Sequence, residues 1–140
     1  MQDDSARPAA CELMLPVSLG DFLDRLTILE IRAERLPDHD SRAHAARHLD
    51  RMRAILDEHG PLPAEALAPL QELRAVNASL WDKESAVRRV RAALNDPEDR
   101  TCAARFCALA QEILAGNERR AALKKTLDQT FGHTPQEKHY

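Results

Sequence analysis

The sequence predicts an all-helical fold, an antiparallel bundle of about four helices, from its composition and its hydrophobic periodicity. Ala and Leu supply 42 of the 140 residues, whereas Val, Ile and Thr together supply 13. Glycine occurs four times and aromatic residues make up 4% of the chain. A β-sheet protein needs more β-branched residues and more turn glycines than this. A chain of this length forms one domain on the usual size relation.

The first helix is expected from Ser18 to the residue before Pro37. The Ser18 hydroxyl can accept a hydrogen bond from the amide of Asp21, as in a capping box. Apolar residues then recur at helical spacing, at Phe22, Leu26, Leu29, Ala33 and Leu36. Residues 1–16 show no such period. We therefore expect a flexible N-terminal arm over 1–16 and a bundle domain over 17–132.

A second helix is expected from a cap at Asp40 or Ser41 to about His59, with Gly60 just after its end. Its apolar stripe is Ala45, Leu49, Met52 and Leu56. A short turn over 64–68 then leads to Pro69, which we expect to be the first residue of a third helix, because proline is tolerated there.

The third and fourth helices have long seams in which apolar residues alternate at spacings of three and four. The third seam consists of Leu70, Leu73, Asn77, Leu80, Glu84, Val87, Arg91 and Leu94. Asp96 and Pro97 form a start signal for a fourth helix that reaches Phe131. This helix is so long that either Gly116–Asn117 kinks or divides it, or its far half extends into a partner chain. The heptad-like seams predict coiled-coil packing, within one chain or between two.

The charge and cysteine content of the chain predict which classes of partner are excluded and in which cellular compartment the protein lies. The net charge is -3, and the 16 Arg and 4 Lys residues are interspersed with 23 acids, so we expect no nucleic-acid binding. Charged residues make up 31% of the chain, so we expect no membrane span. The start of the sequence is acidic, and Cys11, Cys102 and Cys107 lack a C-x-x-C spacing. We therefore expect a cytoplasmic protein with reduced thiols.

Residues 18–36, SLGDFLDRLTILEIRAERL, resemble the opening S-x-G-E-L-L-D-K-L-T-I-L-E-I-K of a bacterial family of small helical proteins, catalogued only as a domain of unknown function. Residues 76–88 look like its N-x-x-L-W-x-I-E-D-x-I-R block. Residues 117–124 look like its N-D-x-R-A-x-x-K block, and residues 132–140 look like its closing G-S…E-E-K-S-Y. The chain departs from this pattern at Ser85 and His139. The resemblance implies an all-helical cytoplasmic protein and implies no activity.

Polar residues in or beside the seams, together with the only Trp, are the candidate site. They are Arg25, Glu30, Asn77, Trp81, Glu84, Arg88, Asn117, Arg119, Arg120 and Lys124. A buried carboxylate needs a cation or hydrogen-bond donors. One interpretation is a closed network of salt bridges and amides that fixes helix register. The other is a polar pocket between the helices. The tail over 133–140 is expected to fold back over the bundle, which would bring Lys138 and Tyr140 to the basic residues.

If a pocket exists, its chemistry is that of an anion site. Arg88, Arg119, Arg120 and Lys124 could clamp a phosphate or a carboxylate. Glu84 or Glu30 would then act as an acid or base, or hold an arginine in place. Asp40, His44 and His48 share one face of the second helix and are a weak metal candidate. No metal-site motif accompanies them, so we expect neither a metal nor a cofactor.

Two functions follow from these alternatives. The first is a non-enzymatic binding module, a homodimer that meets other protein partners. The second is a site, with or without catalysis, for an anionic metabolite that carries phosphate or carboxylate. A binding module should close its polar seam with internal pairs and expose an apolar patch. A ligand site should leave several Arg or Lys donors unpaired around one concave space.

Overall fold

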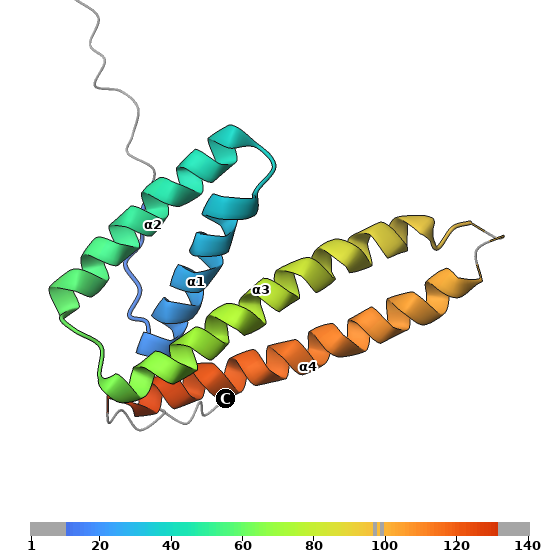
Figure 1. Cartoon of the computed structure of the whole chain (residues 1–140). Coiled ribbons are helices and arrows are strands. Elements are labelled where there is room, and N and C mark those ends of the chain that lie inside the picture. Colours follow the sequence, from blue (N-terminus) through green and yellow to red (C-terminus); the bar gives the residue numbers. More distant parts are fainter. Residues whose placement is uncertain (1–10, 97, 99, 132–140) are drawn as a thin grey trace, which may run out of the picture.

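The structure is a computed structural model that describes residues 11–96, 98 and 100–131. Within this part of the chain it contains four helices and no strand. The helices are α1 (Leu19–Arg35), α2 (His39–His59), α3 (Ala64–Ala93) and α4 (Thr101–Gln129). They pack as an all-α bundle, which confirms the predicted fold class (Figure 1).

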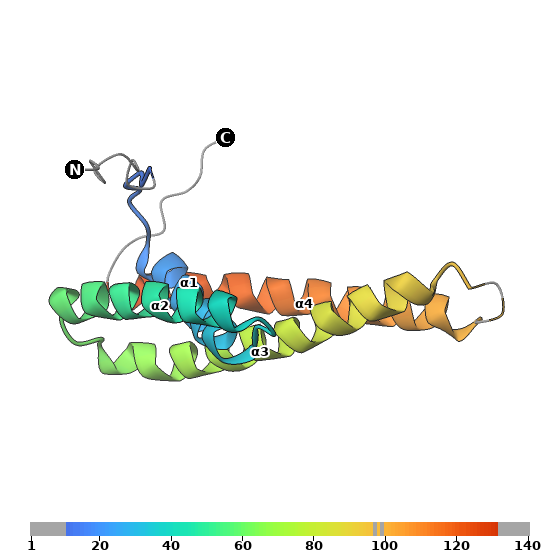
Figure 2. The same cartoon turned by 90° about the horizontal axis from the view of Figure 1, so that it is seen from above.

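The bundle consists of two helical hairpins of unequal length. The α1–α2 hairpin lies along one end of the longer α3–α4 hairpin, which continues beyond it (Figures 1 and 2). Helix α1 is central, because it contacts α2, α3 and α4. The backbone of α2 approaches that of α1 and of no other described helix. We call residues 83–93 of α3 and 101–115 of α4 the distal hairpin, and the rest of the bundle the proximal half.

The apolar core lies in the proximal half, where α1 covers the α3–α4 seam. Its fully buried apolar residues are Leu23, Ala66, Leu73 and Leu127. In the distal hairpin only two described residues, Val90 and Cys102, are buried. The α4 seam residues there are half-buried, namely Phe106, Leu109 and Ile113. The apolar spacing of α4 is the same in both regions. The difference in burial therefore comes from α1, which covers the α3–α4 seam only in the proximal half.

The predicted limits of the first two helices are largely confirmed. The amide of Asp21 donates to the Ser18 hydroxyl over 3.2 Å, as a capping residue requires. The cap of α2 is Asp38, whose carboxylate accepts from the amide of Ser41 over 2.9 Å, so the predicted cap at Asp40 or Ser41 is wrong. Gly60 ends α2 with a φ of 105°, the left-handed region that glycine tolerates best.

The last two helices begin at other residues than predicted. Helix α3 starts at Ala64, so the turn expected over 64–68 is helical and Pro69 lies inside the helix. Its position in the second turn removes one intrahelical donor, and the rest of the helix tolerates that loss. Further along, Val90 is buried and Arg91 is exposed, the reverse of the predicted seam. By this point on α3, the residues predicted by a strict alternation of three and four no longer lie on the face that contacts α4.

Helix α4 begins at Thr101, after the expected start at Asp96 and Pro97. Asp96 belongs to the turn between α3 and α4, and Pro97 lies outside the described residues. The helix continues unbroken through Gly116 and Asn117, which excludes the alternative that these residues divide it. The other alternative, that its far half extends into a partner chain, stays a prediction.

The segment before α1 and the C-terminal tail are described only in part. Residues 11–18 precede α1, and Glu12 in this segment accepts from Arg51 of α2 over 2.6 Å. The remaining part of the predicted arm, 1–10, and the tail from 132 onward lie outside the described residues. None of the described helices combines the length and the apolar character of a membrane-crossing segment.

Candidate functional site

A buried polar cluster lies where α1 meets both α3 and α4, and Asp24 is its centre. The Asp24 side chain is only 4% exposed. Its Oδ1 accepts from Arg120 Nε over 2.8 Å, and its Oδ2 accepts from the Arg120 guanidinium over 2.5 Å. This is the two-pronged pairing that arginine and a carboxylate make best. It connects two helices whose residues are far apart in the chain.

Asn77 and Thr27 complete the cluster on the α3 side. Asn77 Nδ2 donates to Asp24 Oδ1 over 3.0 Å and to Thr27 Oγ1 over 2.8 Å. The Thr27 hydroxyl in turn donates to the backbone carbonyl of Asp24 over 2.8 Å. Among the described residues no buried side-chain nitrogen or oxygen lacks a hydrogen-bond partner. The cluster is therefore closed, as a buried polar network must be if it is to stabilise a fold.

The electrostatics of the cluster hold its central pair charged. Burial disfavours the charged form of Asp24, but hydrogen bonds from Arg120 and Asn77 and the nearby charges of Arg120 and Lys124 outweigh it, so the pKa of Asp24 lies below its usual value. The hydrogen bond to Asp24 raises the pKa of Arg120. The pKa of Asp24 is thus lowered and that of Arg120 is raised, so both pKa values lie further from neutral pH than usual. A general acid or base works best with a pKa near the working pH.

Next to the cluster, the start of α1 is fastened to the end of α4. Lys124 Nζ lies 2.6 Å from Asp21 Oδ1, and this hydrogen bond lowers the pKa of Asp21. The amide of Gly20 donates to Asp128 Oδ1 over 2.7 Å. A Cβ atom at Gly20 would overlap the backbone carbonyl of Lys124, so only glycine permits this approach of the two helices.

The structure brings together some of the predicted site residues. Asn77 and Arg120 belong to the cluster, Lys124 borders it, and the charge of Glu84 acts on Arg120 from one side. The cluster thereby contains candidates from both α3 and α4, as the seam pattern predicts.

Other predicted site residues lie apart from the cluster. Arg119 donates to Glu72 over 2.7 Å, and Glu30 accepts from Arg74 over 3.0 Å. Arg25, Arg88 and Asn117 are exposed, and Trp81 is half-buried. Lys138 and Tyr140 lie outside the described residues, so the predicted docking of the tail stays a prediction.

The metal candidate is not assembled. Asp40, His44 and His48 are all exposed on α2. No group of three His, Cys, Asp or Glu residues in the described ranges is placed to hold a metal ion. The Nδ1 atom of His39, rather than either candidate histidine, lies 3.6 Å from Oδ1 of Asp40.

Sequence reasoning missed the two α1 members of the cluster, Asp24 and Thr27. The predicted stripe of the first helix ran through Leu26 and Leu29, and Asp24 lies beside it. A signal was present, since Leu23 and Ile31 make α1 apolar on more than one face, which is typical of a helix covered on several sides. Polar residues inside such a helix need internal partners.

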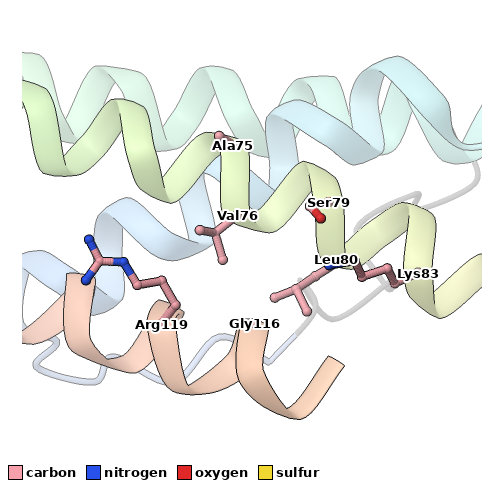
Figure 3. A pocket seen from close by; sticks show the side chains of 7 residues that line it. All are labelled: Ala75, Val76, Ser79, Leu80, Lys83, Gly116 and Arg119. Atoms are coloured by element: carbon pink, nitrogen blue, oxygen red, sulfur yellow. The ribbon is translucent and has the colours of Figure 1, made fainter. Parts of the chain in front are cut away.

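An open groove of about 340 Å³ lies between α3 and α4 (Figure 3). Small or apolar side chains of α3 and Gly116 of α4 form most of its lining, and Lys83 and Arg119 lie at its margins. In Figure 3 the Arg119 guanidinium points away from Leu80, and it is paired with Glu72. Lys83 lies 3.9 Å from Glu112. Both cations at the groove are therefore matched by acids.

Comparisons of the chain with family models, with curated proteins and with solved structures gave no match. The resemblance of residues 18–36, 76–88 and 117–124 to a bacterial family therefore stays a prediction.

Proposed function

We propose that this chain is a non-enzymatic interaction module, a cytoplasmic homodimer that also meets other protein partners. One observation carries the proposal: the cations that would clamp an anionic metabolite are already matched by carboxylates. Arg120 is paired with Asp24, Lys124 with Asp21, and Arg119 with Glu72. Arg88, the fourth predicted cation, is exposed rather than directed into a concave space.

The arrangement of the two hairpins supports the same proposal. The proximal half has a closed polar cluster and a leucine core, which together hold α1 in place. The distal hairpin extends past α1 and α2 and exposes both of its outer faces (Figure 1). Cys11, Cys102 and Cys107 form no disulfide among the described residues, which agrees with a reducing compartment.

A thermal-shift screen against phosphorylated sugars, nucleotides, dicarboxylates and divalent metals tests the proposal. We expect no ligand to stabilise the protein. We expect Arg120→Ala to lower the melting temperature in buffer alone, because it leaves Asp24 without its main partner. The matched control Arg88→Ala, at an exposed arginine that forms no ion pair with the described residues, should leave it unchanged.

The opposite result would establish the metabolite site instead. A ligand present at a hundred times its dissociation constant stabilises a protein by about 2.7 kcal/mol. A shift of that size that disappears in Arg120→Ala would overturn the interaction-module proposal.

A further inference from the structure

We infer that two copies of this chain pair antiparallel through the outer face of α4 in the distal hairpin. This inference rests on the proposed interaction-module function and assigns it a surface, a partner and a register. The α4 outer face consists of the exposed residues Ala104, Cys107, Ala108, Gln111, Leu114 and Ala115, flanked by Arg105 and Glu112.

The α4 outer face lacks the charge that a solvent-facing helix normally carries. From Cys102 to Ala115 the only charged residues are Arg105 and Glu112. Leu114, on one edge of this exposed side, is 64% exposed. Solvent faces of helices are ordinarily rich in charged and polar residues, as α2 is with Arg47, Asp50 and Arg51. An uncharged face of several turns on a projecting hairpin is typical of a surface that another helix covers.

The outer face of α3 in the distal hairpin is unsuited to self-association. Arg88, Arg89 and Arg91 of α3 are exposed and form no ion pair with the described residues. No acid occurs between Ser85 and Leu94 to offset them. Two copies meeting through this α3 face would bring like charges together, which opposes association. Of the two outer faces, only that of α4 suits a second copy.

Residue spacing on α4 favours an antiparallel pair. Ala104, Ala108, Gln111 and Ala115 are separated by four, three and four residues, so they form one stripe. In a two-fold pair, Ala104 faces the partner's Ala115, and Ala108 faces the partner's Gln111. Both pairings put the axis at the same level, between Leu109 and Ala110, as a single two-fold axis requires. Alanine in this stripe allows the two helices to approach closely.

The positions of Arg105 and Glu112 favour the antiparallel orientation over the parallel one. Arg105 and Glu112 are two turns apart on one edge of the stripe, while Cys107 and Leu114 occupy the other edge. In the antiparallel pair, Arg105 lies roughly 3 Å along the axis from the partner's Glu112, and the symmetry repeats this ion pair. Leu114 then packs beside the partner's Cys107. In a parallel pair the charged edge would face the uncharged edge. Arg105 would then have no acid across the interface, and Glu112 would keep only Lys83 of its own chain, at 3.9 Å.

Sedimentation of the full chain under reducing conditions, over a wide range of concentrations, tests the inference. We expect a reversible dimer. Ala108→Lys puts a charge at the middle of the stripe and should weaken it at least about tenfold, without unfolding the monomer because Ala108 is exposed. Arg105→Glu alone and Glu112→Arg alone should each weaken it by placing like charges across the axis. The double variant Arg105→Glu with Glu112→Arg should restore the dimer.

Arg88→Glu on the α3 face is the matched control and should leave the dimer unchanged. A chain that is monomeric at every concentration would overturn the inference. So would a dimer that ignores Ala108→Lys, or a double variant that fails to restore association. A monomer would also remove the homodimer from the proposed function, whereas a dimer that ignores these substitutions would overturn only the surface and the register. None of these results would produce a ligand-dependent thermal shift, which is the result that overturns the interaction module itself.

Discussion

The proximal half and the distal hairpin share the same two long helices, yet they bury their seams to different extents. Leu127 and Leu109 both lie on the α4 seam. Leu127 is fully buried where α1 joins the hairpin, whereas Leu109 is half-buried where it does not. Two helices alone bury few side chains, as Val90 and Cys102 show in the distal hairpin, because their seam stays open to water along its sides. The comparison shows that the α3–α4 seam becomes a buried core only where α1 covers it.

The largest test of this comparison is a pair of identical truncations. Leu127→Ala removes buried methyl groups from a packed core and should lower the free energy of unfolding by about 3 kcal/mol. Leu109→Ala removes the same atoms from a half-exposed seam, and its cost should be about 1 kcal/mol. Urea unfolding followed by circular dichroism measures both. Equal losses would contradict the distinction between the two regions.

A second pair contrasts the glycines at which helices approach closely. Gly20→Ala would drive a methyl group into the α4 backbone at Lys124, which cannot move without separating the helices. We expect a loss of about 2 kcal/mol or more. At Gly116 the nearest atoms belong to the flexible Leu80 side chain, and a helical Ala regains up to about 1 kcal/mol. Gly116→Ala should therefore be much milder, and calorimetry would show the difference as a shift in Tm.

The third prediction concerns acid stability. The folded-state pKa of Asp24 lies below its ordinary value, so the stability it contributes is fully present above about pH 4 and is lost as the pH falls through the folded pKa. The wild-type protein should lose stability steeply below about pH 4, and Asp24→Asn should lose less over that interval. Urea midpoints at several pH values measure both slopes. Parallel slopes would show that other carboxylates, such as Asp21, dominate the acid response.

The smallest expected effect is at the surface. Glu12 and Arg51 form an exposed ion pair between the segment before α1 and α2. Water screens such an exposed pair, so Glu12→Gln should leave the free energy of unfolding close to that of the wild-type protein. A loss comparable to that of Leu127→Ala would mean that this segment is part of the bundle's core support.

Much of the fold could be predicted from local sequence, and the failures have a common cause. Ser18 and Gly60 are recognisable because capping and helix termination depend on nearby residues. Asp24 was missed because its burial depends on Arg120 and Asn77, which tertiary packing alone brings to it. The start of α3 was misplaced at Pro69 because proline is more common in the first turn, but it is also tolerated one turn later.

The pairing of Asp24 with Arg120 has a consequence for synthesis of the chain on the ribosome. The first helix is made well before its partners, because Arg120 follows Asp24 by 96 residues and Asp128 follows Gly20 by 108. Until then α1 and α2 can associate, but Asp24 lacks its guanidinium, and Leu23 lacks the helix that completes its burial. The last folding step must therefore wait until α4 has been made, and it closes a loop of 96 residues between Asp24 and Arg120. Such non-local contacts form slowly. A nascent chain stalled after α3 would expose α1 as a surface for chaperones.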